Sequence, residues 1–173
     1  AHDNSVDWEY LRLVTIVEAA RSGSLECLMF AHQVGCPIEA EHAHYAAAGG
    51  HLTCLQYLLQ NVDLPAGEIH NHNVGGTCAA AAEHGHLACL VCLREHQCAW
   101  DQRTTKGAAA RGSFECLKYA VEQGCTLNKE ACYVAAVRGK HIKCAEYLVS
   151  LAQKEEEETA KAPHRALICC SLT

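Results

Sequence analysis

The stretch AAAGGHLTCLQYLL, residues 46–59, carries the pattern that decides the fold. Two alanines precede Gly50 by four and three positions, and leucines follow it by five, eight and nine positions. Alanine favours helix, and glycine tolerates the left-handed backbone that ends a helix. Leucines three and four positions apart lie on one face of a second helix. The stretch therefore predicts two short helices joined by a tight turn at Gly50.

The same plan occurs five times along the chain. Its turn glycines are spaced by 27, 35, 27 and 27 residues and stand at Gly23, Gly50, Gly85, Gly112 and Gly139. An insertion at 61–76 accounts for the longer spacing, and the position of Cys144 indicates one extra residue in the turn of the last unit. One unit cannot bury its apolar face alone, so neighbouring units must stack into a continuous core. The repeat predicts an all-α helical-repeat solenoid.

Each second helix has apolar residues that we expect to face this core, because their spacing puts them on one side of the helix. They are Leu25, Leu28 and Ala31; Leu52, Leu55, Leu58 and Leu59; Leu87, Leu90 and Leu93; Phe114, Leu117 and Ala120; and Ile142, Ala145 and Leu148.

The repeated units resemble ankyrin repeats, and the match recurs over residues 12–153. The best unit agrees with the family pattern at Ala46, Ala47, Gly50, His51, Cys54, Leu55, Leu58 and Leu59. The family's Thr-Pro-Leu-His opening is reduced to Thr77-Cys78 or Thr104-Thr105. The usual period of about 33 residues is also shortened, at the place where the family forms a β-hairpin finger. The resemblance therefore implies an ankyrin-like solenoid of about five helix-turn-helix units with short or missing β-fingers, and only the insertion has room for a full finger.

We expect two parts in the chain. Residues 1–153 form the repeat domain, with units near 12–36, 40–63, 75–98, 104–125 and 131–153 and the insertion at 61–76. Trp8 and Tyr10 are expected to shield the first end of the stack. Residues 154–173 form an acidic helical extension and C-terminal tail, in which Pro163 is expected to stop the helix.

The chain contains thirteen cysteines, and their placement follows the repeat. Five occupy one slot of the second helix, where ankyrin repeats usually have valine or isoleucine: Cys27, Cys54, Cys89, Cys116 and Cys144. Cysteine is among the most buried residue types. Cys89 and Cys92 form a Cys-x-x-Cys pair, but a structural zinc site needs a second pair at suitable spacing. We therefore interpret the cysteines as core filler and expect neither a metal nor another cofactor.

Composition excludes several classes of function. The formal net charge is −6 and the fourteen lysines and arginines are scattered, so no basic stripe indicates a nucleic-acid partner. No apolar run reaches the roughly 20 residues that span a bilayer, and no secretion signal is present. Thirteen cysteines is an odd number in a chain too long for a small disulfide scaffold. We therefore expect an intracellular, reducing compartment, which would be the cytoplasm, or an organelle if a presequence was removed.

The resemblance implies a non-catalytic protein–protein interaction module, acting as an adaptor or as an accessory or structural subunit of a larger assembly, with no small-molecule substrate. Such arrays bind partners through the concave face and the inter-repeat loops. Trp100 is the preferred anchor, since tryptophan in a loop suits a binding hot spot, and packing over adjacent helices is its alternative role. The candidate contact residues are Glu39, Glu41, His42, His44, Glu68, His70, His72, Trp100, Asp101, Arg103, Asn128 and Lys129.

Two other functions stay open at this point. One is a metal-dependent or thiol enzyme that uses the abundant cysteines and histidines. The other is a lipid-anchored regulator, because Cys170 stands fourth from the end in CSLT, which has the form of a prenylation box. Threonine is an unusual terminal residue for such a box, and no polybasic segment precedes it.

Overall fold

A computed structural model describes residues 8–62 and 74–169, with side chains described over 15–62 and 76–157. Every regular element in these residues is an α-helix, as the repeat predicts, and no strand occurs among them. The helices are α1 (Trp8–Ser22), α2 (Leu25–Gln33), α3 (His42–Gly49), α4 (Leu52–Asn61), α5 (Val74–Glu83), α6 (Leu87–Glu95), α7 (Gln102–Arg111), α8 (Phe114–Glu122), α9 (Lys129–Arg138) and α10 (Ile142–Cys169).

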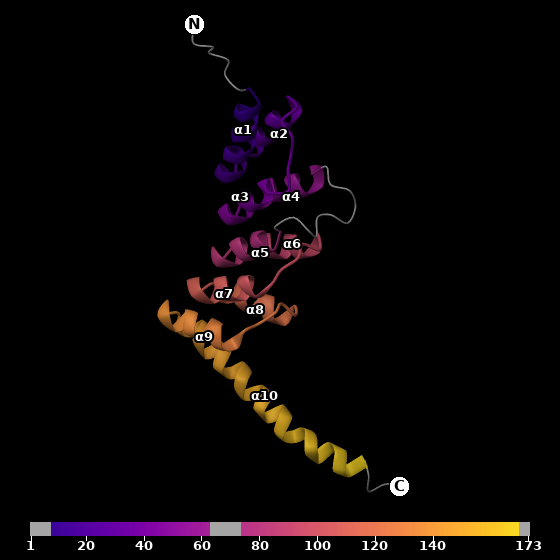
Figure 1. The fold of residues 1–173 in the computed structure, drawn as a ribbon, viewed down its shortest axis with the longest axis vertical. Coiled ribbons are helices and arrows are strands. Elements are labelled where there is room, and N and C mark those ends of the chain that lie inside the picture. The colour runs from indigo at the N-terminus through magenta and orange to yellow at the C-terminus, as the bar shows by residue number, and fades with distance from the viewer. Residues whose placement is uncertain (1–7, 63–73, 170–173) are drawn as a thin grey trace.

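The helices form five pairs that stack one upon the next along a single axis (Figure 1). The first helices α1, α3, α5, α7 and α9 pack against one another in chain order, and each also packs against the second helix of its own pair. The first helices therefore line one side of the stack and the second helices line the other (Figure 1). The predicted finger in the insertion falls largely within residues 63–73, outside the described part of the chain.

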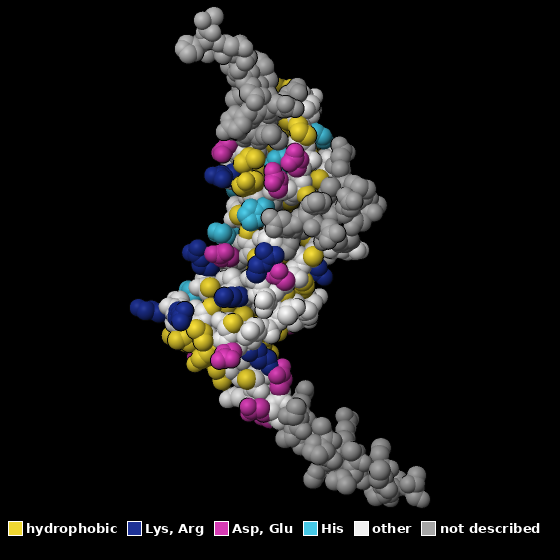
Figure 2. All heavy atoms as spheres, in the orientation of Figure 1, with side chains coloured by type: hydrophobic (Ala, Val, Ile, Leu, Met, Phe, Trp, Pro, Cys, Tyr) yellow, Lys and Arg dark blue, Asp and Glu magenta, His cyan; other side chains and the backbone are white. Residues whose placement is uncertain are grey.

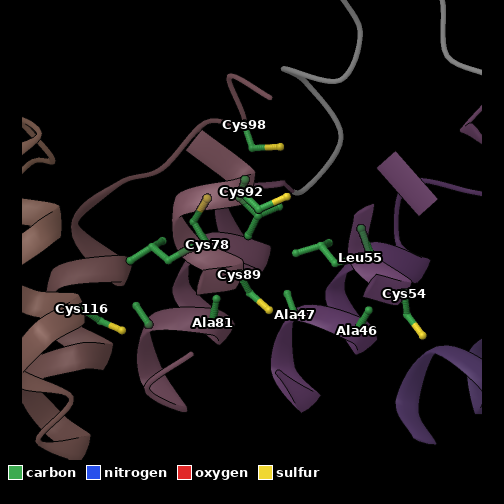
Figure 3. Close-up of a cluster of buried hydrophobic side chains, with 14 of the residues drawn as sticks. Ala46, Ala47, Cys54, Leu55, Cys78, Ala81, Cys89, Cys92, Cys98 and Cys116 are labelled. Atoms are coloured by element: carbon green, nitrogen blue, oxygen red, sulfur yellow. The ribbon is translucent and has the colours of Figure 1, made fainter. Parts of the chain in front are cut away.

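Alanine explains why the first helices lie so close together. Ala46 and Ala47 of α3 are fully buried between their neighbours, as are the alanine pairs of α5 and α7. Beside them, the second helices contribute one leucine each at the same position, and Leu28, Leu55, Leu90 and Leu117 are all 0% exposed. Cysteines lie among these alanines and leucines (Figure 3). The core is thus one continuous apolar column built from the same few positions in every unit.

The turn after each first helix depends on a residue with positive φ. Gly23, Gly50, Gly85 and Gly112 have φ between 75° and 80°. The imidazole of the next unit lies directly over most of these glycines, and a Cβ on Gly50 would stand 2.5 Å from His86 Nδ1. His86 Nε2–H also donates to the Ala48 carbonyl at 3.1 Å. Glycine is therefore required for two reasons: the backbone has a positive φ, and the neighbouring ring leaves no room for a Cβ.

The last turn differs from the predicted one. Gly139 has an ordinary φ of −77°, and Lys140 takes the left-handed position with a φ of 61°. The His141 amide donates to Ala136 O at 2.9 Å, as the His51 amide does to Ala46 O. This turn therefore has the same length as the others. The prediction of an extra residue in it was wrong, and that residue lies earlier, within the longer span between the Asn128 cap and Ala136.

Two further expectations were wrong, one at each end of the stack. Cys27 is exposed, although Cys54, Cys89, Cys116 and Cys144 in the same slot are buried. Ile142 is 69% exposed, although it was expected to face the core. The slot of Cys27 faces the preceding unit and that of Ile142 faces the following unit. Each side chain is exposed because the described structure has no helix pair on that side.

Helix α10 extends far beyond the stack. It has 28 residues, whereas α4, α6 and α8 have nine or ten. It continues through Pro163 to Cys169, so the prediction that this proline ends the helix was wrong. The φ of proline fits a helix, but inside one it removes a backbone hydrogen bond and crowds the carbonyl four residues earlier, at a cost of about 3 kcal/mol. None of the described helices, α10 included, combines the length and the apolar character needed to cross a membrane.

Candidate partner-binding surface

The described thiols lie mostly in the packed core. Ten of the eleven described cysteines are buried. Burial away from water raises the pKa of Cys78 to about 12 and the pKa values of Cys89, Cys98, Cys116 and Cys125 to about 11. The thiolate is the nucleophile and the metal ligand, so thiols held protonated at neutral pH are poorly suited to either role.

We expect alkylation of the native protein to distinguish Cys27 from the other described thiols. At pH 8, a brief pulse of iodoacetamide followed by peptide mass spectrometry should label Cys27, whose side chain is exposed. Buried thiols such as Cys89 should react at least about a hundredfold more slowly, because they become accessible only on local unfolding. The same pulse in urea is the control and should label all of them. Rapid native labelling of Cys89 or Cys116 would contradict their assignment to the core.

One cluster among the described residues has the composition of a cation site. Potential ligand atoms of Glu39, Glu41 and His42 lie within 4.8 Å of one another. The His42 ring, however, is fully buried, and its Nδ1 accepts the Glu39 amide at 2.9 Å. Nε2 then carries the ring proton and has no hydrogen-bond partner. Neither nitrogen offers a lone pair to a cation, and burial lowers the pKa of His42, which also keeps the ring neutral.

Four contact residues were predicted in the first loop, and the structure shows three of them exposed and one buried. Glu39, Glu41 and His44 are exposed, and the His44 ring lies edge-on to Tyr45 at 5.8 Å. The buried His42 side chain has no access to a partner, and we leave it out of the proposed surface. Glu68, His70, His72 and Cys170 lie outside the described residues.

The two later loops use their predicted residues mainly for local structure. Asp101 caps α7 by accepting the Arg103 amide at 2.8 Å, and its carboxylate also pairs with Arg103 Nε at 2.9 Å. Asn128 caps α9 by accepting the Ala131 amide at 3.0 Å. Lys129 pairs with Glu155 of α10.

Trp100 is half-buried in the loop before α7. Its ring lies under the Arg94 guanidinium at 4.3 Å and edge-on to Tyr119 at 6.1 Å. A guanidinium over an indole face is a favourable cation–π arrangement. These contacts support the packing role of Trp100, and its role as a binding anchor stays a prediction.

A shallow groove between α7 and α9 brings Asn128, one of the predicted contact residues, together with residues that the sequence analysis did not select. Its volume is about 370 Å³, and Val134 on its floor is 41% exposed. Two cations flank it, Lys106 from α7 and Arg138 from α9, and neither forms an ion pair with another described residue. One carboxylate, that of Glu130, also lines the groove. Figure 2 shows several lysine and arginine side chains spread over this part of the surface, with acidic side chains between them. Aligning the units could have flagged Val134, since α3 has polar His44 at that position.

The comparisons with known proteins identify the fold. The structure is similar to the crystal structure of the human ASB11 ankyrin repeat domain, with a TM-score of 0.62 and 21% sequence identity, over 79% of this chain and 68% of that chain. No protein-family model and no curated protein matches the sequence. The chain therefore has the ankyrin-repeat fold, as the residue pattern implied.

Proposed function

We propose that this ankyrin-fold chain is a non-catalytic protein-interaction module, serving as an adaptor or as an accessory subunit of a larger assembly. The observation that carries the proposal is that each unit uses one set of residues for packing and another for its outer surface. Small and apolar residues build the stack, and the outward side of α3, α7 and α9 exposes mostly polar and charged side chains that the core does not use, with Val134 as an apolar exception. A rigid repeated surface of this kind suits a partner protein.

The groove between α7 and α9 is the part of this surface that best fits a partner segment. Its floor of Ala131, Val134 and Ala135 offers apolar contact. Lys106 and Arg138 beside it outweigh the single carboxylate of Glu130, so the groove is positively charged on balance. Arg111 nearby is already paired with Glu83 at 3.0 Å. The complementary partner segment would carry an apolar side chain flanked by carboxylates. Charged rims of this kind guide association and orient the partner, and the apolar contact contributes affinity.

Charge reversal in the groove tests this proposal. In cells that make the protein, proximity cross-linking should recover a defined partner with the wild-type chain. Replacing both groove cations, Lys106→Glu and Arg138→Glu, should reduce that recovery by about tenfold or more, since an attraction becomes a repulsion. Both side chains are exposed, so urea unfolding of the variant should match the wild type.

The matched control is Lys118→Glu, an exposed lysine on α8, on the other side of the stack. It reverses one charge, where the groove variant reverses two, and should leave recovery of the partner intact. Equal recovery with the groove variant and the control would remove the groove from the proposal. Failure to recover any protein with the wild-type chain would contradict the interaction function itself.

A further inference from the structure

The last helix pair presents an apolar end face, which we define as Tyr133, Val137, Ile142, Ala145 and Val149. Four of these side chains are 42%, 50%, 69% and 42% exposed, and Ala145 is half-buried. The hydrogen bonds of the turns align the units, and so show which residues of the earlier units occupy the same positions. Val137 corresponds to Ala20, Ala47, Ala82 and Ala109, all 0% exposed, and Ala145 corresponds to the four buried leucines from Leu28 to Leu117. The end face thus consists of positions that every earlier unit covers with its successor.

A stack that simply ended here would be expected to carry polar residues on this side, because terminal repeats of soluble arrays have a polar outer face. The side chains of the end face are instead tyrosine, valine, isoleucine and alanine. An exposed apolar surface that spans two helices marks a site of association.

The shape of the end face differs from the interfaces inside the stack. Val137 replaces an alanine, and Tyr133 stands at a position where the earlier units have a smaller residue, so α9 is bulkier than the other first helices. The smaller residues are Ile16, Ala43, Cys78 and Thr105. Ala145 replaces a leucine, so α10 is slimmer at that point. Together they leave a groove of about 620 Å³ between α9 and α10, which follows α10 from Ile142 to Gln153. A standard helix pair would be held away by Val137, whereas a single helix could lie along this groove.

Helix α10 is itself such a helix. Ile142 and Val149 form an outward ridge along it, spaced by seven residues, beside the groove that the same helix lines. One surface therefore carries both a ridge and a groove, which is the arrangement that a two-fold interface requires. We propose that the end face binds the end face of a second copy of this chain, with the two α10 helices antiparallel and each ridge in the partner's groove.

Charge supports the antiparallel arrangement. Glu156 continues the ridge seven residues after Val149, and Ile142 lies seven residues before it. With Val149 of both copies at the two-fold axis, Glu156 of one copy lies opposite Ile142 of the other, at the corner where Lys140 lines the groove. A parallel arrangement would set the acidic run 155–157 of one copy against the same run of the other. In the first arrangement Glu156 approaches Lys140, with Glu146 lining the same groove, whereas in the second the two acidic runs face each other.

The test is the oligomeric state of the whole chain across a range of concentrations, measured by sedimentation velocity in a reducing buffer. The wild type should be a concentration-dependent dimer. Ile142→Asp should raise its dissociation constant by about a hundredfold or more, because it places a charge in the centre of an apolar contact. Lys140→Glu should raise the dissociation constant by about tenfold, because the new carboxylate would repel Glu156 of the other copy. The double variant Lys140→Glu with Glu156→Lys should return the dissociation constant to within about threefold of the wild-type value.

Phe30→Asp is the matched control, because Phe30 is 64% exposed at the opposite end of the stack. It should leave the dimer unchanged, and thermal unfolding of all variants at low concentration should show that each is folded. A monomeric wild type would overturn the proposal. Open-ended oligomers that both Phe30→Asp and Ile142→Asp disrupt would also overturn it, in favour of head-to-tail stacking. Failure of the charge swap to restore the dimer would overturn the antiparallel arrangement.

Discussion

Replacing Gly50 by alanine is expected to lower the free energy of unfolding by about 2–4 kcal/mol. A left-handed conformation costs an alanine roughly 1–2 kcal/mol, and the φ of Gly50 is 76°. In addition, the new Cβ would lie 2.5–2.9 Å from three atoms of the His86 ring. The ring must then move and give up its hydrogen bond to Ala48, which costs about 1 kcal/mol more. Urea unfolding followed by circular dichroism measures the change.

Gly124→Ala separates the two contributions. Gly124 has almost the same φ, 78°, but no atom lies within 4 Å of the position of its Cβ. This control should show only the backbone cost, about 1–2 kcal/mol. If both substitutions destabilise the protein equally, the imidazole over Gly50 contributes nothing to stability.

Alkaline pH is expected to unfold the protein through its buried thiols. Their pKa values are about 11 to 12 in the folded chain for Cys78, Cys89, Cys98, Cys116 and Cys125, against 9.0 for an ordinary thiol. Above pH 9 the unfolded chain loses these protons while the folded chain keeps them. The unfolded state then binds fewer protons, so stability is complete below pH 9 and is lost as the pH rises toward 11.

The slope of this loss is large because many thiols contribute. Each buried thiol lowers the free energy of unfolding by on the order of 1 kcal/mol per pH unit within that window. Five of them together approach the whole stability of a typical domain, about 5–15 kcal/mol, within one or two pH units. Urea unfolding at several pH values between 8 and 11, with a phosphine reductant present, gives the slope directly.

Substitution of thiols by valine tests whether the buried thiols cause the loss of stability at alkaline pH. Cys89→Val combined with Cys116→Val removes two buried thiols and should make the slope shallower by on the order of 2 kcal/mol per pH unit. Cys27→Val, in the same slot of the first unit, removes no buried thiol and should leave the slope unchanged. An identical slope in all three proteins would show that the thiols do not govern the alkaline transition.

Most of the fold could be predicted from the sequence because the same local signals occur in every unit. The turn glycines, the alanine pairs and the leucine spacing each specify a local conformation, and their repetition specifies the stack. The cysteines could be assigned to the core for the same reason, since their position in the repeat matched an apolar slot. The structural similarity to an ankyrin repeat domain confirms this prediction of the fold.

Less of the candidate surfaces could be predicted. His42 was selected as a polar residue near a loop, yet it is fully buried, because it occupies the inner position that Thr77 and Thr104 occupy in later units. Lys106, Val134 and Arg138 were missed because they come from two helices and meet only across the groove. The end face was missed because Ile142 carries the same apolar signal as Leu52.

The sequence by itself determined the helix pairs, their turns and their stacking, since these depend on short-range preferences and on an apolar pattern repeated within the chain. Only the tertiary structure decided which copy of a repeated position is buried. Cys27 and Cys54 occupy the same slot, each with a leucine two residues before and one residue after it, and one is exposed while the other is buried. The physical reason is that burial depends on whether another helix pair lies against that side of the unit, and the residues of the unit do not encode the presence of that neighbour.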